Sequence, residues 1–145
     1  MPLVHLVRHG RAAAGWNVDP DPALDRIGRS QAVAVGERLA LLDRCEVITS
    51  PLRRCRETAE PLLAAWGGVA RVEPRVAEIP SPEGVAMEDR VDWLRLAMQG
   101  TWSELGDRYT AYRDDVVAAL RALPADAVVF SHFIAINVAI GAALG

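Results

Sequence analysis

The hydrophobic residues of this chain fall into two alternating patterns: short apolar runs, and longer stretches in which apolar positions recur every three or four residues. Short apolar runs are typical of buried strands, and the wider spacing is typical of amphipathic helices. The short runs predict strands over residues 3–7, 46–49, 70–77 and 127–130. The remaining patterned stretches predict helices over residues 27–43, 51–66, 86–98, 103–123 and 133–144.

Turn-forming residues separate these elements. Residues 11–24 contain Asp19-Pro20-Asp21-Pro22, which resists both helix and central strand, and residues 79–85 form a proline- and glycine-containing loop. Ser50 is predicted to cap the second helix, with Pro51 at its first position and Gly67-Gly68 at its end. Strands that alternate with helices favour a parallel sheet covered on both faces. We therefore predict an α/β fold, a three-layer sandwich whose mostly parallel central sheet is flanked by helices.

Composition narrows the class of protein. With 145 residues, 51% of them hydrophobic, the chain fits a single domain over residues 1–145. A net charge of -3 argues against a nucleic-acid or anionic-membrane partner, and no run approaches the roughly 20 apolar residues of a membrane span. No signal-peptide pattern precedes the first strand, so a cytoplasmic location is expected. The sequence makes no prediction of oligomeric state.

The chain contains no lysine, and all 16 of its cationic Lys or Arg positions are arginine. This excludes mechanisms that need a Schiff-base lysine or a phosphate-binding lysine of the Walker type. Any phosphate or carboxylate must instead be held by arginine, histidine or backbone amides. Arginine suits this role, because its planar guanidinium can donate two parallel hydrogen bonds to one oxyanion.

Polar groups follow several of the predicted strands. Arg8-His9-Gly10 follows the first strand, Arg54 lies just after the second, Glu78 follows the third and His132 follows the fourth. The carboxyl ends of parallel strands form the edge at which ligands bind in open α/β sheets. Two histidines, two arginines and a carboxylate at one edge are suited to phosphoryl transfer, with arginines on the phosphate oxygens, a histidine as nucleophile and a carboxyl group as acid.

Five segments, in order along the chain, resemble the histidine phosphatase superfamily, the phosphoglycerate mutase-like group. The segments are Leu6-Val7-Arg8-His9-Gly10, Leu24-Asp25-Arg26-Ile27-Gly28-Arg29-Ser30-Gln31-Ala32, Ser50-Pro51-Leu52-Arg53-Arg54-Cys55-Arg56-Glu57-Thr58-Ala59, Glu78-Ile79 and Val128-Val129-Phe130-Ser131-His132. Together they cover nearly the whole chain. The resemblance implies the sandwich fold predicted above and an enzyme that acts on a small phosphorylated substrate.

The resemblance also implies a role for each matching residue. His9 matches the nucleophile that forms a phosphohistidine, and Arg8 and Arg54 match the two arginines that hold the phosphate. His132 matches the second histidine that contacts the phosphoryl group. Glu78 matches the general acid, whose pKa would have to be raised for it to be protonated near neutral pH. The resemblance implies no metal and no organic cofactor.

The sequence departs from the family pattern at three places. Ala12 and Gly15 occupy positions where the family commonly has threonine and asparagine, so Asn17 is the candidate to supply the missing polar contact to substrate. Phe133 replaces a common glycine after the second histidine and is expected to narrow or cover the pocket. The family usually adds at least one strand after the last helix, so we expect the C-terminal strand or strands to be missing from residues 1–145.

Three functions remain open on the sequence alone. The first is a phosphomonoester hydrolase that works through a phosphohistidine at His9. The second is a mutase that moves phosphate within one small acid, which the short connection after Glu78 disfavours. The third is a non-catalytic module that binds phosphate or a phosphoprotein, which the changes at Ala12 and Gly15 motivate. A serine hydrolase centred on Ser50 or Ser131 is disfavoured, because no G-x-S-x-G segment is present.

Overall fold

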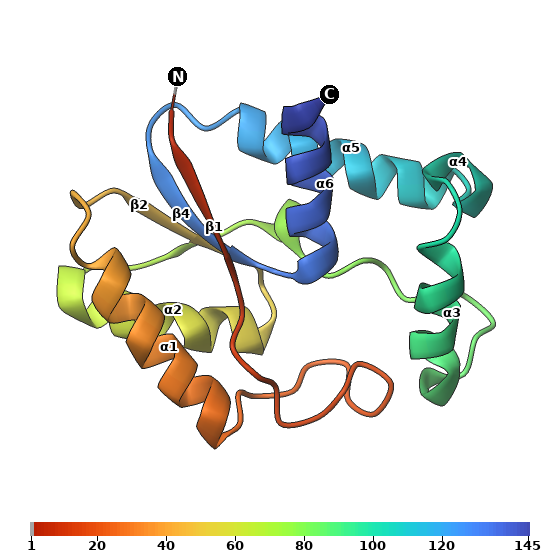
Figure 1. Ribbon diagram of the computed structural model, residues 1–145, viewed down its shortest axis with the longest axis horizontal. Coiled ribbons are helices and arrows are strands. Elements are labelled where there is room, and N and C mark those ends of the chain that lie inside the picture. Colours follow the sequence, from red (N-terminus) through yellow and green to blue (C-terminus); the bar gives the residue numbers. More distant parts are fainter. Residues whose placement is uncertain (1) are drawn as a thin grey trace.

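The computed structural model describes residues 2–145 and contains one parallel sheet of four strands, in the order β1-β4-β2-β3. The strands are β1 (Val4–Arg8), β2 (Glu46–Thr49), β3 (Arg71–Val72) and β4 (Ala127–Ser131). All pairings between them are parallel. The sequence prediction of an α/β fold with a parallel central sheet is therefore confirmed (Figure 1).

Helices cover both faces of the sheet. Helices α1 (Arg26–Leu39) and α2 (Arg53–Trp66) pack together on one face, and α5 (Asp107–Arg121) and α6 (Phe133–Leu144) pack together on the other (Figure 1). The strand side chains alternate between these layers, as the pleat of a strand requires. Val128 and Phe130 pack in a cluster with α2, whereas Ala127 and Val129 pack in a cluster with residues of α5. The two hydrophobic layers fix the sheet between the helix pairs.

The first two helices differ from prediction at their ends. Asp25 caps α1 by accepting a hydrogen bond from the backbone N–H of Gly28, and the helix ends at Leu39 rather than at residue 43. Helix α2 begins at Arg53, not at Pro51, and its N-cap is Leu52. The prediction that Ser50 is the N-cap of this helix is wrong, because the helix starts later and the Ser50 hydroxyl contacts a buried histidine ring. Gly67 ends α2 in the left-handed conformation, with φ of 68°, as the sequence predicted.

In the middle of the chain, the helices and the third strand are shorter than predicted. The extended segment over 70–77 contributes only the two-residue β3, because Pro74 starts the short 3-10 helix η1 (Pro74–Val76). The helix predicted over 86–98 consists of the 3-10 helix η2 (Met87–Asp89) followed by α3 (Arg90–Ala97). The helix predicted over 103–123 is divided at Gly106, with φ of 100°, into α4 (Trp102–Leu105) and α5.

The C-terminal part follows the prediction closely. Strand β4 is fully buried at all five positions, and α6 covers residues 133–144 as expected. Strands β1 and β3 form the two edges of the sheet within residues 2–145. None of the helices in this range combines the length and hydrophobicity needed to cross a membrane.

Candidate active site

The carboxyl ends of β1, β4 and β2 meet at one edge of the sheet. The backbone N–H of His9 donates to the carbonyl of Ser131 at 3.1 Å, and that of Ser50 donates to the carbonyl of Phe130 at 2.9 Å. These bonds continue the parallel ladder beyond the strand ends. The residues that follow the three strands are therefore held at the same level, where ligands bind in open α/β sheets.

The imidazole of His9 presents an unprotonated nitrogen toward Arg54. Its Nδ1 lies 2.7 Å from the carbonyl oxygen of Gly10, so this nitrogen carries the hydrogen and donates it. Its Nε2 then accepts from Nε of Arg54 at 3.3 Å. Burial, followed by the nearby charges of His132, Arg54 and Arg8, lowers the pKa of His9 to about 4, although the bond to Gly10 acts in the opposite direction. His9 is thus neutral at neutral pH, and its Nε2 is available as a nucleophile.

Side chains from α1 and α2 hold the loop that follows His9. The N–H of Gly10 donates to Oγ1 of Thr58 at 3.0 Å, and the N–H of Arg11 donates to Oε1 of Gln31 at 2.8 Å. Gly28 packs directly on this loop, where a Cβ would overlap the carbonyl of Arg11. Thr58, Gln31 and Gly28 all lie in the sequence motifs, but nothing in the motifs indicates that they contact this loop.

Arg54 lies at the centre of the site with only 4% of its side chain exposed. Its Nε donates to His9, and its Nη2 donates to Oε2 of Glu78 at 3.2 Å. Its Nη1 is buried and has no hydrogen-bond partner in the described part of the chain. A buried guanidinium nitrogen without an acceptor is costly unless a ligand supplies one. The geometry of Arg54 therefore suits an oxyanion placed between His9 and Glu78.

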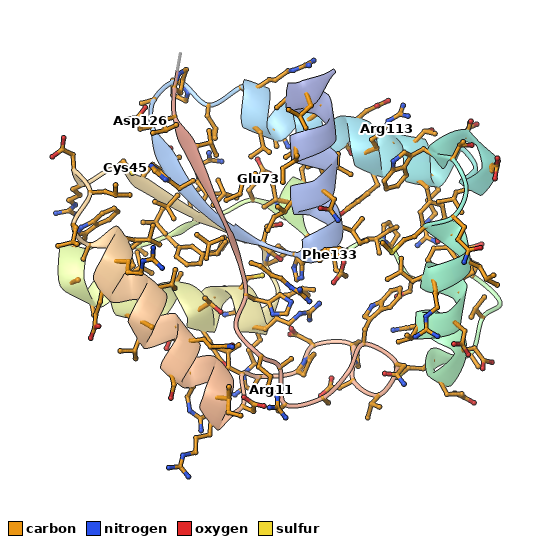
Figure 2. The ribbon with its side chains drawn as sticks, in the orientation of Figure 1. Arg11, Cys45, Glu73, Arg113, Asp126 and Phe133 are labelled. Carbon is orange, nitrogen blue, oxygen red and sulfur yellow. The ribbon has the colours of Figure 1, made fainter. Side chains whose placement is uncertain are left out.

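Arg8 occupies the mouth of the site rather than its centre. Its side chain is exposed and its guanidinium lies 5.3 Å from the centre of the Phe133 ring, a cation–π contact. Phe133 begins α6 (Figure 2) and does not line the pocket that contains His9. Phe133 therefore does not narrow or cover this pocket directly, because its ring packs against Arg8, which does line the pocket.

Glu78 reaches the site from a segment whose carbonyls are held by the sheet and by the opposite helix layer. Ser131 Oγ donates to the carbonyl of Val76 at 2.6 Å, and the hydroxyl of Tyr112 donates to the carbonyl of Ala77 at 2.8 Å. Oε1 of Glu78 accepts from the following backbone N–H at 3.0 Å. These contacts leave Oε2 directed at Arg54 and His132.

The carboxyl group of Glu78 is ionised in this arrangement. Burial acts to raise its pKa, but the hydrogen bond and charge of His132, together with the charge of Arg54, outweigh burial and lower the pKa below its ordinary value. A general acid requires a raised pKa, as expected from the sequence. In the ligand-free site the pKa shift has the opposite sign, because His132 first, and then the backbone N–H of Ile79 and the charge of Arg54, stabilise the carboxylate.

His132 lies behind the pocket rather than in its wall. Its side chain is fully buried, and it is not among the residues that line the pocket around His9. Nε2 lies 2.8 Å from Oγ of Ser50, and Nδ1 lies 3.4 Å from Oε2 of Glu78. The rings of His9 and His132 meet edge to face, with centroids 5.3 Å apart. The ligand-free site therefore does not present His132 for the expected direct contact with a phosphoryl group.

Ser50, His132 and Glu78 stand in the order of the hydroxyl, imidazole and carboxylate of a serine hydrolase triad. Ser50 is fully buried, however, so a substrate carbonyl cannot reach its oxygen. The geometry is therefore unsuited to nucleophilic attack by Ser50, in agreement with the absence of the corresponding sequence motif.

A pocket of about 710 Å³ opens in front of His9. Its wall is formed by residues 8–16 together with Pro22, Gln31, Arg54 and Glu78. Arg11, labelled on the loop in Figure 2, is ion-paired with Asp25 at 2.8 Å. Three arginines against one carboxylate make the wall suited to an anion. Asn17 does not line this pocket, so the structure does not place it where the sequence predicted a substrate contact.

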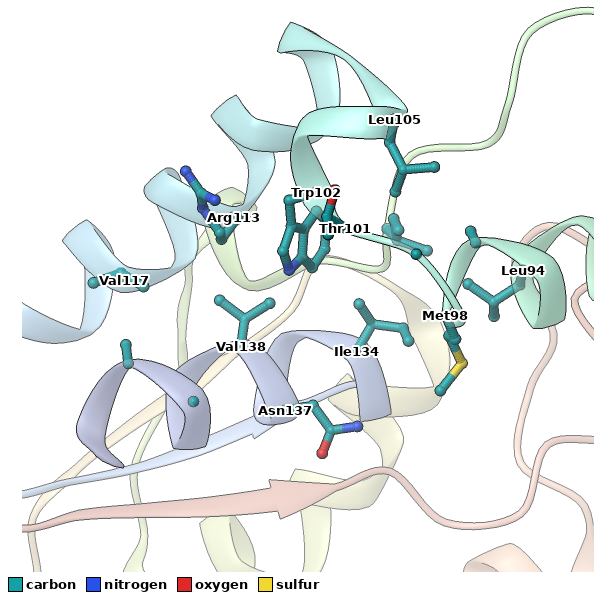
Figure 3. A pocket seen from close by; sticks show the side chains of 15 residues that line it. Leu94, Met98, Thr101, Trp102, Leu105, Arg113, Val117, Ile134, Asn137 and Val138 are labelled. Atoms are coloured by element: carbon teal, nitrogen blue, oxygen red, sulfur yellow. The ribbon is translucent and has the colours of Figure 1, made fainter. Parts of the chain in front are cut away.

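A second pocket, of about 430 Å³, lies between α3, α4, α5 and α6 and is mainly apolar (Figure 3). Trp102, Met98 and Ile134 are among its lining residues, and Arg113 is its one charged residue. It contains neither histidine nor carboxylate, so it offers no group for phosphoryl transfer. The chemistry therefore belongs to the pocket around His9. Across residues 2–145, no cluster of three or more His, Cys, Asp or Glu side chains could hold a metal ion.

Three tryptophans lie near these pockets and contact different parts of the protein. Trp16 lines the pocket around His9, and its ring is 6.5 Å from that of Trp93, which in turn lies 5.4 Å from Tyr109. Trp102 lines the apolar pocket. Of the three, Trp16 is therefore the one that a substrate in front of His9 can reach.

Comparison with known proteins places nearly the whole chain in one family. The family model of the histidine phosphatase superfamily, branch 1, matches residues 4–145. A protein from Erwinia tasmaniensis named "Probable phosphoglycerate mutase GpmB" is 30% identical over 168 aligned positions, which include 98% of this chain and 74% of the relative. Because this alignment is longer than the chain, the relative has additional residues within the matched region.

Solved structures agree with the sequence comparison. A phosphoglycerate mutase from Thermus thermophilus is 28% identical and superposes with a TM-score of 0.66, covering 93% of this chain and 80% of that one. A mycobacterial glucosyl-3-phosphoglycerate phosphatase solved with VO3 is 25% identical with a TM-score of 0.66, covering 94% of this chain and 79% of that one. The similar structures therefore include both a mutase and a phosphatase.

Proposed function

The chain belongs to the histidine phosphatase superfamily, branch 1, and on that premise we propose that it is a phosphomonoester hydrolase acting through a phosphohistidine at His9. The proposed substrate is a small phosphorylated molecule, with its phosphoryl group between His9 and Glu78. The mycobacterial phosphatase that is similar in structure supports hydrolysis. The proposal assigns no role to a metal or an organic cofactor.

The proposal rests on two atoms whose side chains line the same pocket, which is suited to an anion. They are the unprotonated Nε2 of His9 and Nη1 of Arg54, which is buried and has no hydrogen-bond partner within residues 2–145. Nε2 lies 3.3 Å from Nε of Arg54, so a phosphoryl group bound by this guanidinium is held beside the nucleophile. Holding reacting groups together in this way removes much of the entropic part of the barrier. The donors of Arg54 would also stabilise the charge on the phosphoryl oxygens in the transition state.

In the first step, the lone pair of His9 Nε2 forms a bond to phosphorus while the bond from phosphorus to the leaving oxygen breaks. Glu78 donates a proton to that oxygen, so an alcohol departs. The hydrogen bond from Nδ1 to the carbonyl of Gly10 holds the ring in the tautomer that leaves Nε2 free, and it stabilises the positive charge that the ring gains.

In the second step, a water molecule replaces the alcohol. Glu78, now ionised, accepts a proton from the water as its oxygen attacks phosphorus. The N–P bond breaks, its electrons return to Nε2 of His9, and inorganic phosphate leaves. Arg54 and Arg8 are the cationic side chains from the sequence prediction that line the pocket and can hold the phosphate during both steps.

The test compares the parent protein with His9→Ala on 4-nitrophenyl phosphate. We expect the substitution to abolish turnover, because the covalent intermediate cannot form. Arg56→Ala is the control, since Arg56 is exposed and its Nε bonds the carbonyl of Pro51 outside the pocket. Equal turnover by the parent and His9→Ala would exclude the phosphohistidine route. Phosphate or vanadate binding with no turnover over a broad panel would favour the binding module.

A mutase is the second candidate, favoured by the names of the Erwinia relative and the Thermus structure. Such an enzyme must return the phosphoryl group to a second hydroxyl before water reaches His9. The two activities are separated by the products formed from 3-phosphoglycerate. Release of inorganic phosphate supports the hydrolase, and conversion to the 2-phosphate isomer supports the mutase.

A further inference from the structure

The proposed reaction gives no role to the tryptophan in the wall of the His9 pocket. Trp16 lies on the loop after β1, and within residues 2–145 it is the one aromatic side chain other than His9 that lines this pocket. The pocket, of about 710 Å³, is in the size range of sites that hold a whole small molecule. A phosphoryl group beside His9 and Arg54 therefore leaves room for the alcohol part of the substrate along the wall that Trp16 helps to form.

Arg90, the first residue of α3, packs on the Trp16 ring. Its guanidinium carbon lies 5.4 Å from the centre of the indole. Nε and Nη1 of Arg90 are buried, and neither has a hydrogen-bond partner within residues 2–145. The indole is therefore the favourable contact that compensates this partly desolvated cation, and cation–π attraction is strongest where water is excluded. The contact ties the loop after β1 to α3.

A second residue of α3 packs near the same ring. The Trp93 ring lies 6.5 Å from that of Trp16, with an angle of 53° between their planes, and 5.4 Å from the ring of Tyr109 in α5. Tyr109 is buried, and its hydroxyl donates to the carbonyl of Pro80 at 3.2 Å. Figure 1 shows the loop after β1 extending toward α3. Although Trp16 belongs to a loop, it is thus held by packed side chains of two helices.

The pocket reaches a part of the indole that these neighbours leave open. Trp16 lines the pocket, whereas Arg90 and Trp93 do not. The α3 side chains and the pocket therefore meet different parts of the ring. An aromatic surface that is already held in place suits stacking, because little side-chain freedom is lost when a ligand arrives.

The loop that leads to Trp16 offers a ligand no polar side chains. Residues 12–15 are three alanines and a glycine, and all four line the pocket together with Pro22. The N–H of Ala13 and the carbonyl of Gly15 are already hydrogen-bonded to other backbone groups of the loop. The hydroxyls of a sugar would meet no side-chain partner along these residues, and burying them unpaired is unfavourable. An aromatic ring needs no such partner.

We infer that the alcohol part of the substrate carries an aromatic ring that stacks on Trp16, and that Arg90 is a positioning residue that holds the indole for this contact. The inference rests on the proposed function, and it narrows the substrate class to phosphomonoesters of alcohols that contain an aromatic ring. The phosphoryl group lies between His9 and Glu78, and the ring lies against the indole. Because the stacking is made equally in the bound substrate and in the transition state, it raises kcat/KM and leaves kcat nearly unchanged.

The kinetic test compares benzyl phosphate with cyclohexylmethyl phosphate in the parent and in Trp16→Leu. The two alcohols are similar in size and both leave as alkoxides, but only the first has a flat aromatic face. We expect the ratio of kcat/KM for the benzyl ester to that for the cyclohexyl ester to be about fivefold larger in the parent than in Trp16→Leu. Comparing the two proteins cancels any difference in reactivity between the alkoxides. An equal ratio in the two proteins would overturn the inference.

Trp102→Leu is the matched control, because it makes the same change of side chain at another pocket. Trp102 lines the apolar pocket between α3 and α6 and does not line the pocket around His9. The ratio in this variant should stay within about twofold of the parent's. A ratio that falls as far in Trp102→Leu as in Trp16→Leu would assign the effect to general packing and contradict stacking on Trp16.

Arg90→Leu and Arg90→Lys test the positioning role. Lysine keeps a cation beside the indole, whereas leucine removes it. We expect the ratio of the two kcat/KM values to fall about twofold in Arg90→Leu and to stay at the parent's value in Arg90→Lys. The same ratio in both variants, whether kept or lost, would contradict a role for the charge of Arg90 in holding the ring.

Isothermal titration calorimetry of the parent tests the stacking without turnover and without any substitution. The ligands are benzylphosphonate and cyclohexylmethylphosphonate, which cannot release an alcohol. We expect Kd to be about fivefold lower for benzylphosphonate, and equal Kd values would contradict the inference. Failure of the parent to hydrolyse either ester would count against the proposed function, which this binding result does not require. Hydrolysis of both esters with the same ratio in the parent and Trp16→Leu would count against the inference alone.

Discussion

The two faces of the sheet hold different parts of the site. On the face covered by α1 and α2, side chains accept hydrogen bonds from the backbone N–H groups of the loop after His9. On the face covered by α5, a side chain donates a hydrogen bond to a carbonyl of the segment that carries Glu78. Thr58 and Gln31 do the first, and Tyr112 does the second. The first face therefore positions the nucleophile and the second positions the acid. A change on one face should affect bond formation to phosphorus, and a change on the other should affect the leaving group.

The largest effect is expected at Arg54, which contacts both His9 and Glu78. Arg54→Ala removes the buried donors for the phosphoryl oxygens, and one such donor contributes about 10²–10³ in rate. We expect kcat/KM on 4-nitrophenyl phosphate to fall about 10³-fold, whereas the exposed Arg56→Ala should stay within about twofold of the parent. Comparable losses in the two variants would show that Arg54 acts only through the general positive charge of the helix.

Thr58→Val and Tyr112→Phe remove one hydrogen-bonding hydroxyl from each of the two faces. Thr58→Val leaves the N–H of Gly10 unpaired, which should cost about 1–3 kcal/mol of unfolding free energy. It should also lower kcat/KM about tenfold for both nitrobenzyl and nitrophenyl phosphate, because the His9 loop shifts. Tyr112→Phe leaves the carbonyl of Ala77 without this donor and should lower only the value for the benzyl ester, about threefold, because the alkoxide that this ester releases needs a proton and nitrophenolate does not. The division between the faces fails if the two variants show the same pattern.

A smaller effect is expected on stability as a function of pH. The pKa of His9 is about 4 in the folded protein, below the ordinary value of 6.5. Between these values the unfolded chain takes up a proton on His9 that the folded chain does not, so this residue makes the protein less stable as pH falls from 6.5 to about 4. Urea unfolding should show a smaller loss over this range for His9→Gln than for the parent. Parallel curves would mean that burial does not shift the pKa of His9.

Much of the fold could be predicted because the strands coincide with short apolar runs in the sequence. The apolar run of β4 is buried at every position, and its side chains alternate between the two helix layers. The order of the motifs also placed Arg54 and Glu78 near His9, because parallel strands end at one edge. In contrast, the start of α2 was misplaced, because the Ser50 hydroxyl contacts His132, and these two residues are 82 positions apart in the sequence.

Contacts between distant residues also explain which parts of the site could not be predicted. The Tyr112 hydroxyl contacts a carbonyl 35 positions away, and such a contact leaves no local pattern. The burial of His132 depends on packing between separate elements, so the motif could not show that its ring lies behind the pocket wall in the ligand-free site. The sign of the Glu78 pKa shift depends on Arg54 and His132 together, and therefore requires their positions in three dimensions.

If His9 becomes phosphorylated during turnover, the phosphorylated enzyme can be trapped before water releases the phosphate. The parent is mixed with a phosphomonoester that it hydrolyses, quenched in alkali within one turnover, digested and analysed by mass spectrometry. We expect an acid-labile phosphoryl group on the peptide that contains His9, and none in His9→Ala. Hydrolysis by the parent without a phosphoryl group on His9, or with one on another residue, would rule out His9 as the nucleophile.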